Sequence, residues 1–409
     1  MNTTNKYTTL LLSVSIFILF FSYYYFTSNV LPQGAGPDWK SNTDVTSFIY
    51  EKGRLAVFPD DEHDLYFTVH GGSRALRPPF SYIVSAMTAG VFSSADIDKH
   101  ILFRKGSALL GALTVALTFY ALSLYFLSLR IGILGAAIIG LMPQFTFISS
   151  YNNDDSGAIF SATLLITALI HIYRYGINYK NASFLGLAGG IVIISKVTAW
   201  LLLPLVLLFM ALFIRARSRS LLRYTAIAGI LFMLAGGWWL VMNISLYGID
   251  DPILTKLSST VVEKHKRIAP ELSVGFAAQG VGYHDLLISN HKDFLGATAR
   301  STIGNLDWLR LKVGSLQYGV YLIIFYIAIF YYLFMLSHRL YKTALNIPLQ
   351  ESEKRQFAFE TVLFLMLVFQ MLMYTWTNIY NIIQIQGKYI IPVFLPLLLL
   401  FFFWNQTYI

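Results

Sequence analysis

The stretch TLLLSVSIFILFFSYYYFT at Thr9–Thr27 decides the fold class, because it is apolar along its whole length and carries no charged residue. A helix of about 20 apolar residues is long enough to cross a hydrocarbon core roughly 30 Å thick. No convincing small-x-small cleavage site follows the stretch. We therefore interpret it as an uncleaved first transmembrane helix rather than a signal peptide.

The composition extends this interpretation to the whole chain. Of 409 residues, 56% are hydrophobic and 12% are charged, whereas about 25% of a soluble globular chain is charged. The formal net charge is +9, but most basic residues lie in short loops between apolar runs, so we do not predict nucleic acid as a partner. The chain has no cysteine, which excludes disulfides, a thiolate nucleophile and Cys-ligated metals.

Apolar runs recur along the sequence. They predict an all-α, polytopic transmembrane bundle of about ten helices, with nine to eleven as the range. The runs are 9–27, 104–129, 131–149, 156–173, 183–198, 199–214, 223–245, 317–337, 357–376 and 389–405.

The positions of the basic residues predict the orientation of the bundle. If the runs alternate in direction, the basic loop residues fall on one side, which the positive-inside rule makes cytoplasmic, together with the N-terminus. These residues are Lys6, Arg130, Arg174, Lys180, Arg215, Arg217, Arg219, Arg223, Arg339, Lys342, Lys354 and Arg355. The segments 28–103 and 248–316, the turn Ser150–Asp155 and the turn near Gln386–Lys388 are then extracytoplasmic. We therefore expect an integral multi-pass protein of a bacterial inner membrane.

We divide the chain into an N-terminal transmembrane catalytic module, 1–245, which includes the first outer loop 28–103, an extracytoplasmic segment, 246–316, and C-terminal transmembrane helices, 317–409. Within the first outer loop, helical spacing of apolar residues predicts a short helix from Asp44 to Gly53, with Asp44 as its cap. The piece Phe80–Phe92 follows two prolines and is too short to span a bilayer, so we expect an interfacial helix.

Three acidic positions are candidates for catalysis. Asp38 lies in GPDWKSNTD at Gly36–Asp44, where the chain has left the first apolar run; it is either a general base at the membrane surface or an ordinary turn residue after Gly-Pro. The tight connection YNNDD at Tyr151–Asp155 places Asn153, Asp154 and Asp155 on the same predicted side. Asn and Asp are also common turn formers, and Asp155 could cap the following helix.

Cations near apolar runs form a second candidate group. Lys196, Lys388 and Arg104 lie within or at the edge of such runs, where a charge is costly and indicates a function with an anionic partner. The alternative is snorkelling to the nearer interface. Several cations at the outer face would suit a lipid-linked phosphate or diphosphate.

Two further clusters favour simpler interpretations. The run Asp60–Asp64 contains oxygen and imidazole metal ligands, but a contiguous acidic run is typical of a solvated loop, and we predict no metal and no cofactor. Lys264–Arg267 with Arg300 could attract lipid headgroups or form a solvated basic surface. The chain lacks a Walker P-loop, a G-x-S-x-G elbow and an H-E-x-x-H helix, which argues against ATP-driven transport and ordinary hydrolysis.

Several of these elements, in this order, resemble the GT-C superfamily of membrane glycosyltransferases. More narrowly, the chain is similar to the branches related to protein O-mannosyltransferases and aminoarabinose transferases, and to DUF2142 proteins. Gly36-Pro37-Asp38 followed by Gly53-Arg54-Leu55 resembles the first outer loop of that superfamily. The matching stretches continue through Arg77–Tyr82, Arg104, Pro143-Gln-Phe, Asn153-Asp154, Lys196-Val-Thr, Gly304–Trp308 and Gln386–Pro392.

The resemblance implies roles for these residues. Asp38 would be the catalytic base, with Asp154 or Asp155 as a second acidic site. Lys196, Lys388 and Arg104 or Arg77 would hold the phosphate of a polyprenyl-phosphate sugar, and Asn153 and Tyr389 would complete the binding site. Three departures matter: Trp39 follows Asp38 where the related loops often have a second acid, Arg77 stands where His or Gln is usual, and Lys388 replaces the common arginine and so loses its planar fork. They leave the donor sugar and metal use open.

The predicted activity is the transfer of a sugar from a polyprenyl-phosphate carrier to an extracytoplasmic glycan, lipid or protein, with inversion at the anomeric carbon. One alternative is a lipid-linked glycan flippase or transporter, and another is a polysaccharide polymerase. The sequence does not indicate the sugar, the acceptor, the lipid length or the oligomeric state.

Overall fold

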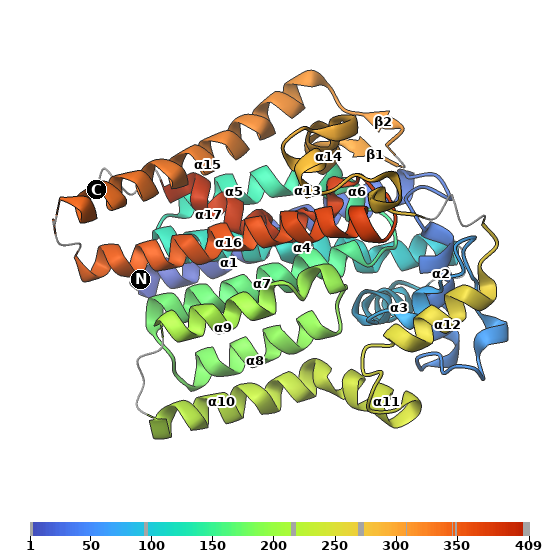
Figure 1. Cartoon of the computed structure of the whole chain (residues 1–409). Coiled ribbons are helices and arrows are strands. Elements are labelled where there is room, and N and C mark those ends of the chain that lie inside the picture. Colours follow the sequence, from blue (N-terminus) through green and yellow to red (C-terminus); the bar gives the residue numbers. More distant parts are fainter. Residues whose placement is uncertain are drawn as a thin grey trace.

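The protein, seen in a computed structural model, is an assembly of helices with one small hairpin (Figure 1). The structure describes residues 3–93, 97–213, 218–268, 274–307, 309–345, 347 and 350–403. Its helices are α1 (Thr3–Val30), α2 (Trp39–Lys52), α3 (Phe80–Phe92), α4 (Lys99–Phe126), α5 (Leu129–Gly140), α6 (Pro143–Ile148), α7 (Asp155–Tyr175), α8 (Tyr179–Ile193), α9 (Leu202–Phe213), α10 (Ser218–Phe232), α11 (Trp238–Tyr247), α12 (Thr255–His265), α13 (Tyr283–Leu287), α14 (Phe294–Ile303), α15 (Ser315–Ala344), α16 (Glu351–Tyr380) and α17 (Phe394–Phe402). Strands β1 (Asn305–Leu306) and β2 (Leu311–Lys312) pair antiparallel.

Six helical stretches among the described residues are long and apolar enough to cross a membrane, so the chain is an integral multi-pass membrane protein. They are Tyr7–Val30, Lys99–Phe126, Asp155–Tyr175, Ser220–Tyr247, Ser315–Lys342 and Glu351–Tyr380. Shorter apolar helices accompany them at Phe80–Phe92, Leu129–Gly140, Val197–Phe213 and Gly387–Phe402.

Every apolar run predicted from the sequence contains helix among the described residues. The run 131–149 breaks into α5 and α6 because Pro143 begins α6 and cannot continue α5. The runs 183–198 and 199–214 are separate helices, α8 and α9, joined by a 3₁₀ turn at Val197–Ala199. The run 223–245 stays continuous through a π-helical turn at Met233–Gly237.

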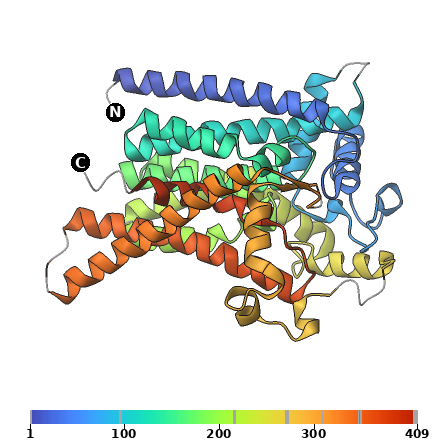
Figure 2. The ribbon, with the colours of Figure 1, turned by 90° about the horizontal axis from the view of Figure 1, so that it is seen from above.

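The polar connections gather at one end of the bundle. Figure 1 shows α2, α3, α12, α13, α14 and the β1–β2 hairpin together at the right, whereas the labelled ends of the chain lie at the left. Figure 2 shows the same separation from above. This arrangement agrees with the predicted alternation of the helices. Arg215 and Arg217 lie outside the described residues.

The two long outer segments bind each other through the acidic and basic runs noted in the sequence. Lys264 Nζ lies 2.8 Å from Glu62 Oε1, and the His265 ring stacks on Phe67 with a centroid distance of 3.7 Å. The backbone N–H of Arg267 donates to Val69 O at 2.9 Å. These runs therefore form an interface within the protein. The described residues contain no group of three or more His, Asp and Glu side chains that could hold a metal.

The first outer loop differs from the prediction at Asp44. Helix α2 begins at Trp39, so Asp44 lies inside the helix and does not cap it. Its Oδ2 instead accepts a hydrogen bond from the Tyr66 N–H at 2.9 Å. The predicted cap was wrong because the helix uses Asp38 as its N-cap residue, in a left-handed backbone conformation with φ of 58°. Helix α3 has the bounds that the sequence predicts.

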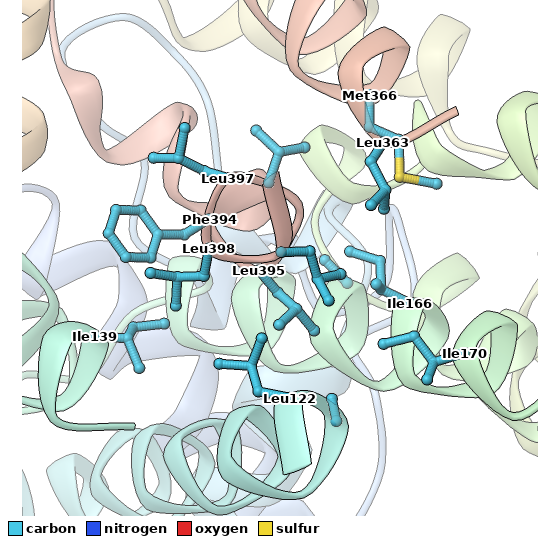
Figure 3. Packing of buried hydrophobic residues seen from close by; sticks show 14 of the residues in the cluster. Leu122, Ile139, Ile166, Ile170, Leu363, Met366, Phe394, Leu395, Leu397 and Leu398 are labelled. Carbon is cyan, nitrogen blue, oxygen red and sulfur yellow. The ribbon is translucent and has the colours of Figure 1, made fainter. Parts of the chain in front are cut away.

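Helix α17 lies in the centre of the apolar core. In Figure 3 its side chains Leu395 and Leu398 point toward Leu122 of α4 and Ile139 of α5. The neighbouring helices α7 and α16 enclose it on another side. The chain enters α17 through 3₁₀ turns at Gly387–Tyr389 and Ile391–Val393. The packed core thus fixes the segment that carries Lys388.

Close packing of α3 on α4 gives a first prediction. A Cβ atom at Gly106 of α4 would lie 2.4 Å from the Ser85 Cα of α3. We expect Gly106→Leu to lower the free energy of unfolding by about 1–3 kcal/mol because the helices must separate. Denaturation of the detergent-solubilised chain, followed by circular dichroism, measures this change.

Gly90→Leu on α3 is the matched control, because a Cβ there has no atom within 4 Å. It should be neutral or slightly stabilising, since Leu favours helix over Gly. Equal effects of the two substitutions would contradict the close approach of α3 and α4.

Candidate active site

Charged side chains from separate segments converge at the polar end of the bundle. Asp38 precedes α2, Asp154 and Asp155 begin α7, and Arg74 belongs to a 3₁₀ turn at Arg74–Leu76. Lys196 follows α8, and Lys388 precedes α17. With Arg77 these residues form the charge cluster: Asp38, Arg74, Arg77, Asp154, Asp155, Lys196 and Lys388.

The two lysines hold the acidic pair at the start of α7. Lys196 Nζ donates to Asp154 Oδ1 and Asp155 Oδ1, each at 2.7 Å. Lys388 Nζ lies 3.1 Å from the other carboxylate oxygen of Asp155, Oδ2. The Tyr389 ring covers both cations, with its centroid 5.1 Å from Lys196 Nζ and 5.4 Å from Lys388 Nζ. The structure thus brings together these five predicted site residues.

Arg74 links Asp38 to this pair, and the sequence interpretation missed it. Its Nη2 lies 2.5 Å from Asp38 Oδ2, and its Nη1 lies 3.9 Å from Asp154 Oδ2. The residue stands in a polar loop, GGSRALRPP, where an arginine ordinarily faces solvent. The sequence feature that could have indicated Arg74 as a site residue is its position three residues before Arg77 and the two prolines.

Burial and pairing set the ionisation of Asp154. Its side chain is 7% exposed. Burial alone would raise the pKa of Asp154, but Lys196, Arg74 and Arg77 outweigh it and hold the pKa well below its usual range. Its charge therefore stabilises the fold at every pH above the ordinary value of 3.8, and this stability is lost only as the pH falls below that value. At neutral pH Asp154 does not exchange a proton.

Asp38 is the accessible carboxylate of the cluster. Its side chain is 32% exposed, against 7% for Asp154 and 4% for Asp155. Arg74 contacts its Oδ2, and no described residue donates a hydrogen bond to its Oδ1. The backbone around it is held by the Asn42 N–H, which donates to Asp38 O at 3.0 Å. Asp38 is thus fixed in place with one oxygen available.

Asn153 shapes the turn that carries the acidic pair. Its Nδ2 donates to Ile148 O at 2.7 Å and Tyr151 O at 2.5 Å. Its Oδ1 accepts from the Ser156 N–H at 2.8 Å, as an N-cap side chain does. The sequence-predicted Asn153 therefore lies beside the charge cluster and satisfies backbone groups of the turn.

Arg104 lies apart from the cluster. Its guanidinium donates to the carbonyl oxygens of Ser28, Leu31 and Pro32 at 2.7–2.9 Å, at the C-terminal end of α1. A cation there satisfies carbonyl groups that have no partner within the helix. Arg77 differs: its side chain is 47% exposed, and its Nη1 lies 3.7 Å from Asp154 Oδ2.

Two hollows adjoin the cluster. An apolar hollow, partly open to solvent, includes Phe48, Phe58 and Trp239 in its lining and reaches Arg74 and Arg77. A polar hollow, also partly open, is lined in part by Lys388 and Pro37. The cluster therefore has one apolar and one polar approach.

Lys196 gives a second prediction, because it is the cation shared by both buried carboxylates. We expect Lys196→Met to lower the free energy of unfolding by about 3–5 kcal/mol, since it leaves uncompensated buried charge. Adding Asp155→Asn to this variant should recover part of the loss. Denaturation of the two variants and the unmodified chain in detergent measures both changes.

Lys99→Met is the matched control, because Lys99 pairs with Glu51 at the exposed surface, where an ion pair contributes little. A loss of stability in Lys99→Met as large as that in Lys196→Met would show that the buried pairing stabilises the fold no more than an exposed ion pair does.

Comparisons with known proteins give the fold but no sequence family. No family model and no curated protein matches the sequence. Archaeal oligosaccharyltransferase AglB from Archaeoglobus fulgidus aligns over 95% of this chain and 50% of its own, at 14% identity with a TM-score of 0.52. Two structures of ArnT from Cupriavidus metallidurans, one bound to undecaprenyl phosphate and one apo, align over 95% of this chain at 15% and 13% identity.

The ArnT alignments have TM-scores of 0.46 and 0.44 and cover 59% and 75% of those chains, so the fold assignment rests on AglB alone. The chain spans about half the length of AglB. The protein shares the fold of AglB, in agreement with the fold that the sequence resemblance predicts.

Proposed function

We propose that the protein is a membrane glycosyltransferase that transfers a sugar from a polyprenyl-phosphate carrier to an acceptor hydroxyl at the polar end of the bundle. The observation that carries this proposal is the charge cluster, in which accessible Asp38 stands beside a buried set of paired charges. The AglB structure, which has the same fold, contains a dolichol-phosphate and an inhibitory peptide. A lipid phosphate is therefore the first donor carrier to test.

Asp38 is the general base in this mechanism. Its free Oδ1 takes the proton of the acceptor hydroxyl while the acceptor oxygen forms a bond to the anomeric carbon. The bond between that carbon and the phosphate oxygen breaks, and its electron pair leaves with the polyprenyl phosphate. A single displacement of this kind inverts the anomeric centre. Arg74 contacts the other oxygen, Oδ2, at 2.5 Å and so orients the carboxylate toward the acceptor.

Arg77 and Lys388 are the cations that receive the departing phosphate. Arg77 is the most exposed cation of the cluster, and Lys388 borders the polar hollow. Charge-assisted hydrogen bonds from such groups stabilise the negative charge that develops on the leaving group. Lys196 has a different role, because both of its short hydrogen bonds go to carboxylates. It is a positioning residue for Asp154 and Asp155.

The apolar hollow is the proposed site for the first part of the carrier chain. It is lined mainly by apolar side chains of α2, the first outer loop and α11, with Arg74 and Arg77 as its cations. An apolar cavity with a few convergent polar groups suits an amphiphilic ligand. An isoprenoid tail there would bring its phosphate to Arg77.

The positions of the basic loops support a reaction outside the cytoplasm. The basic short loops belong to the opposite end from the charge cluster, and the positive-inside rule makes that end cytoplasmic. Acceptors would be extracytoplasmic glycans, lipids or proteins at a bacterial inner membrane.

The distribution of buried charge favours a transferase over a flippase or transporter. Among the described residues, Arg339 and Glu360 are buried charges that lie away from the polar end, and they pair with each other. The other buried charged side chains belong to the outer segments, the cluster, or the first turns of α4. A transport path would instead require charges distributed through the bilayer.

The third prediction tests the general base. The purified full chain is incubated in nanodiscs with undecaprenyl-phosphate-linked mannose, glucose or galactose and an extract of bacterial envelope glycans, lipids and proteins. We expect radiolabelled sugar to enter the extract. Asp38→Asn should lower the transfer rate about 10²–10⁴-fold, because the acceptor loses its base, and should leave donor binding unchanged.

Asp60→Asn is the matched control, because Asp60 is an exposed carboxylate in the same outer segment. It should transfer sugar at the unmodified rate. An Asp38→Asn variant that turns over normally would remove Asp38 as the base. Lipid movement across the bilayer without transfer would favour a flippase, and extension of a diphosphate-linked glycan would favour a polymerase.

A further inference from the structure

We propose that the polar hollow beside Lys388 is a binding site for one sugar ring, and that Gln144 is a specificity-determining residue within it. The inference rests on the proposed function for the source of the sugar, because a glycosyltransferase must hold either the donated ring or a ring of a glycan acceptor. Both sources present the same chemistry, which is a compact ring that carries several hydroxyl groups.

The lining of the hollow suits such a ring. The hollow is partly open to solvent, so a ring would enter it by one edge. Its polar lining residues come from α6, α14, the β1–β2 hairpin and the turn before α17: Gln144, Ser301, Asn305, Asp307, Gln386 and Lys388. Amide groups both donate and accept, and a carboxylate accepts at two oxygens. Vicinal hydroxyl groups, which also donate and accept, are the natural complement of this set.

Gln144 gives the strongest indication of a missing partner. Gln144 is only 5% exposed, yet no described residue donates a hydrogen bond to its Oε1. A buried carbonyl oxygen without a partner costs about 1–3 kcal/mol. Because Gln144 lines the hollow, a ligand hydroxyl there would satisfy this oxygen.

The hollow is rigid on the side nearest the charge cluster. Ser301 Oγ accepts from the Gly387 N–H at 2.7 Å, which ties α14 to the turn that carries Lys388. Asp307 Oδ1 accepts from the Gly36 N–H at 3.0 Å, which ties the hairpin to the loop that carries Asp38. Pre-organised polar groups of this kind discriminate between ligands because they cannot move to new partners.

The position of the hollow also fits the transfer. Lys388 borders it and contacts Asp155, and Pro37, the residue before Asp38, borders it too. A ring bound there would lie between the proposed phosphate contacts and the base. The apolar hollow is lined mostly by apolar side chains, including Phe48, Phe58 and Trp239, and so offers several hydroxyls fewer partners.

The fourth prediction is tested by binding, independently of turnover. The full chain in nanodiscs is titrated with undecaprenyl phosphate, with the same lipid phosphate bearing mannose, glucose or galactose, and with maltotriose and mannotriose as free glycans. Glucose and mannose are titrated as references for the two free glycans. We expect one lipid-linked sugar to bind at least tenfold more tightly than bare undecaprenyl phosphate, or one free glycan to bind at least tenfold more tightly than its monosaccharide. Gln144→Met should remove about tenfold of that preference, the equivalent of about 1.4 kcal/mol, and leave bare undecaprenyl phosphate binding unchanged.

Gln33→Met is the matched control, because Gln33 is an exposed glutamine that lines a different hollow. It should keep the full sugar preference. Gln386→Met is a second test within the polar hollow and should also lower the preference, which keeps the proposal testable if Gln144→Met does not fold.

The outcomes distinguish a failure of the proposed sugar site from a failure of the proposed glycosyltransferase activity. A preference confined to lipid-linked sugars assigns the hollow to the donor, and one confined to free glycans assigns it to the acceptor. Sugar-dependent binding that Gln144→Met weakens, without any transfer by the unmodified chain, would support the hollow and contradict the proposed function. Equal binding with and without sugar, or a preference that survives both Gln144→Met and Gln386→Met, would overturn the proposal.

Discussion

The pairing of the buried carboxylates at the start of α7 is the constraint on which the site depends. Asp154 and Asp155 are adjacent and nearly enclosed, and two such charges are too costly to bury without cations and hydrogen bonds. Lys196 from the end of α8 and Lys388 from the entry to α17 supply them. Because α17 lies in the centre of the core, the same pairing ties the polar end to the packed helices below it.

This pairing divides the residues of the charge cluster into those that support the site and those that can react with a substrate. Lys196 donates to both Asp154 and Asp155, and all three side chains are nearly enclosed, so their role is to support the site. Asp38 and Arg77, at the edge of the cluster, retain exposed atoms. A site whose outer groups are held by inner pairs is pre-organised, and pre-organised charge is the main source of electrostatic catalysis.

The sequence was sufficient for the bundle and for part of the site. Apolar runs such as Thr9–Thr27 have one stable arrangement in a bilayer, and Lys196 and Lys388 were visible because a lysine beside an apolar run is costly. Arg74 was missed because it lies in a polar loop, where an arginine needs no explanation. Arg104 was visible for the same reason as the lysines, and Asn153 because it stands in the tight polar turn Tyr151–Asp155. Their partners are backbone carbonyl and N–H groups, which a sequence does not display.

Lys388 and Arg77 both differ from the pattern of the family that the sequence resembles, and this geometry explains the two differences together. At 388 an ammonium group carries three donors, of which Asp155 takes one. The others remain for the polar hollow that Lys388 borders. An arginine fork there would match both oxygens of Asp155 and leave less for a ligand. The planar fork is present instead at Arg77, which is half exposed at the mouth of the apolar hollow. In the proposed function Arg77 thus supplies a bidentate phosphate contact on the apolar side, and Lys388 supplies a point charge beside the polar hollow.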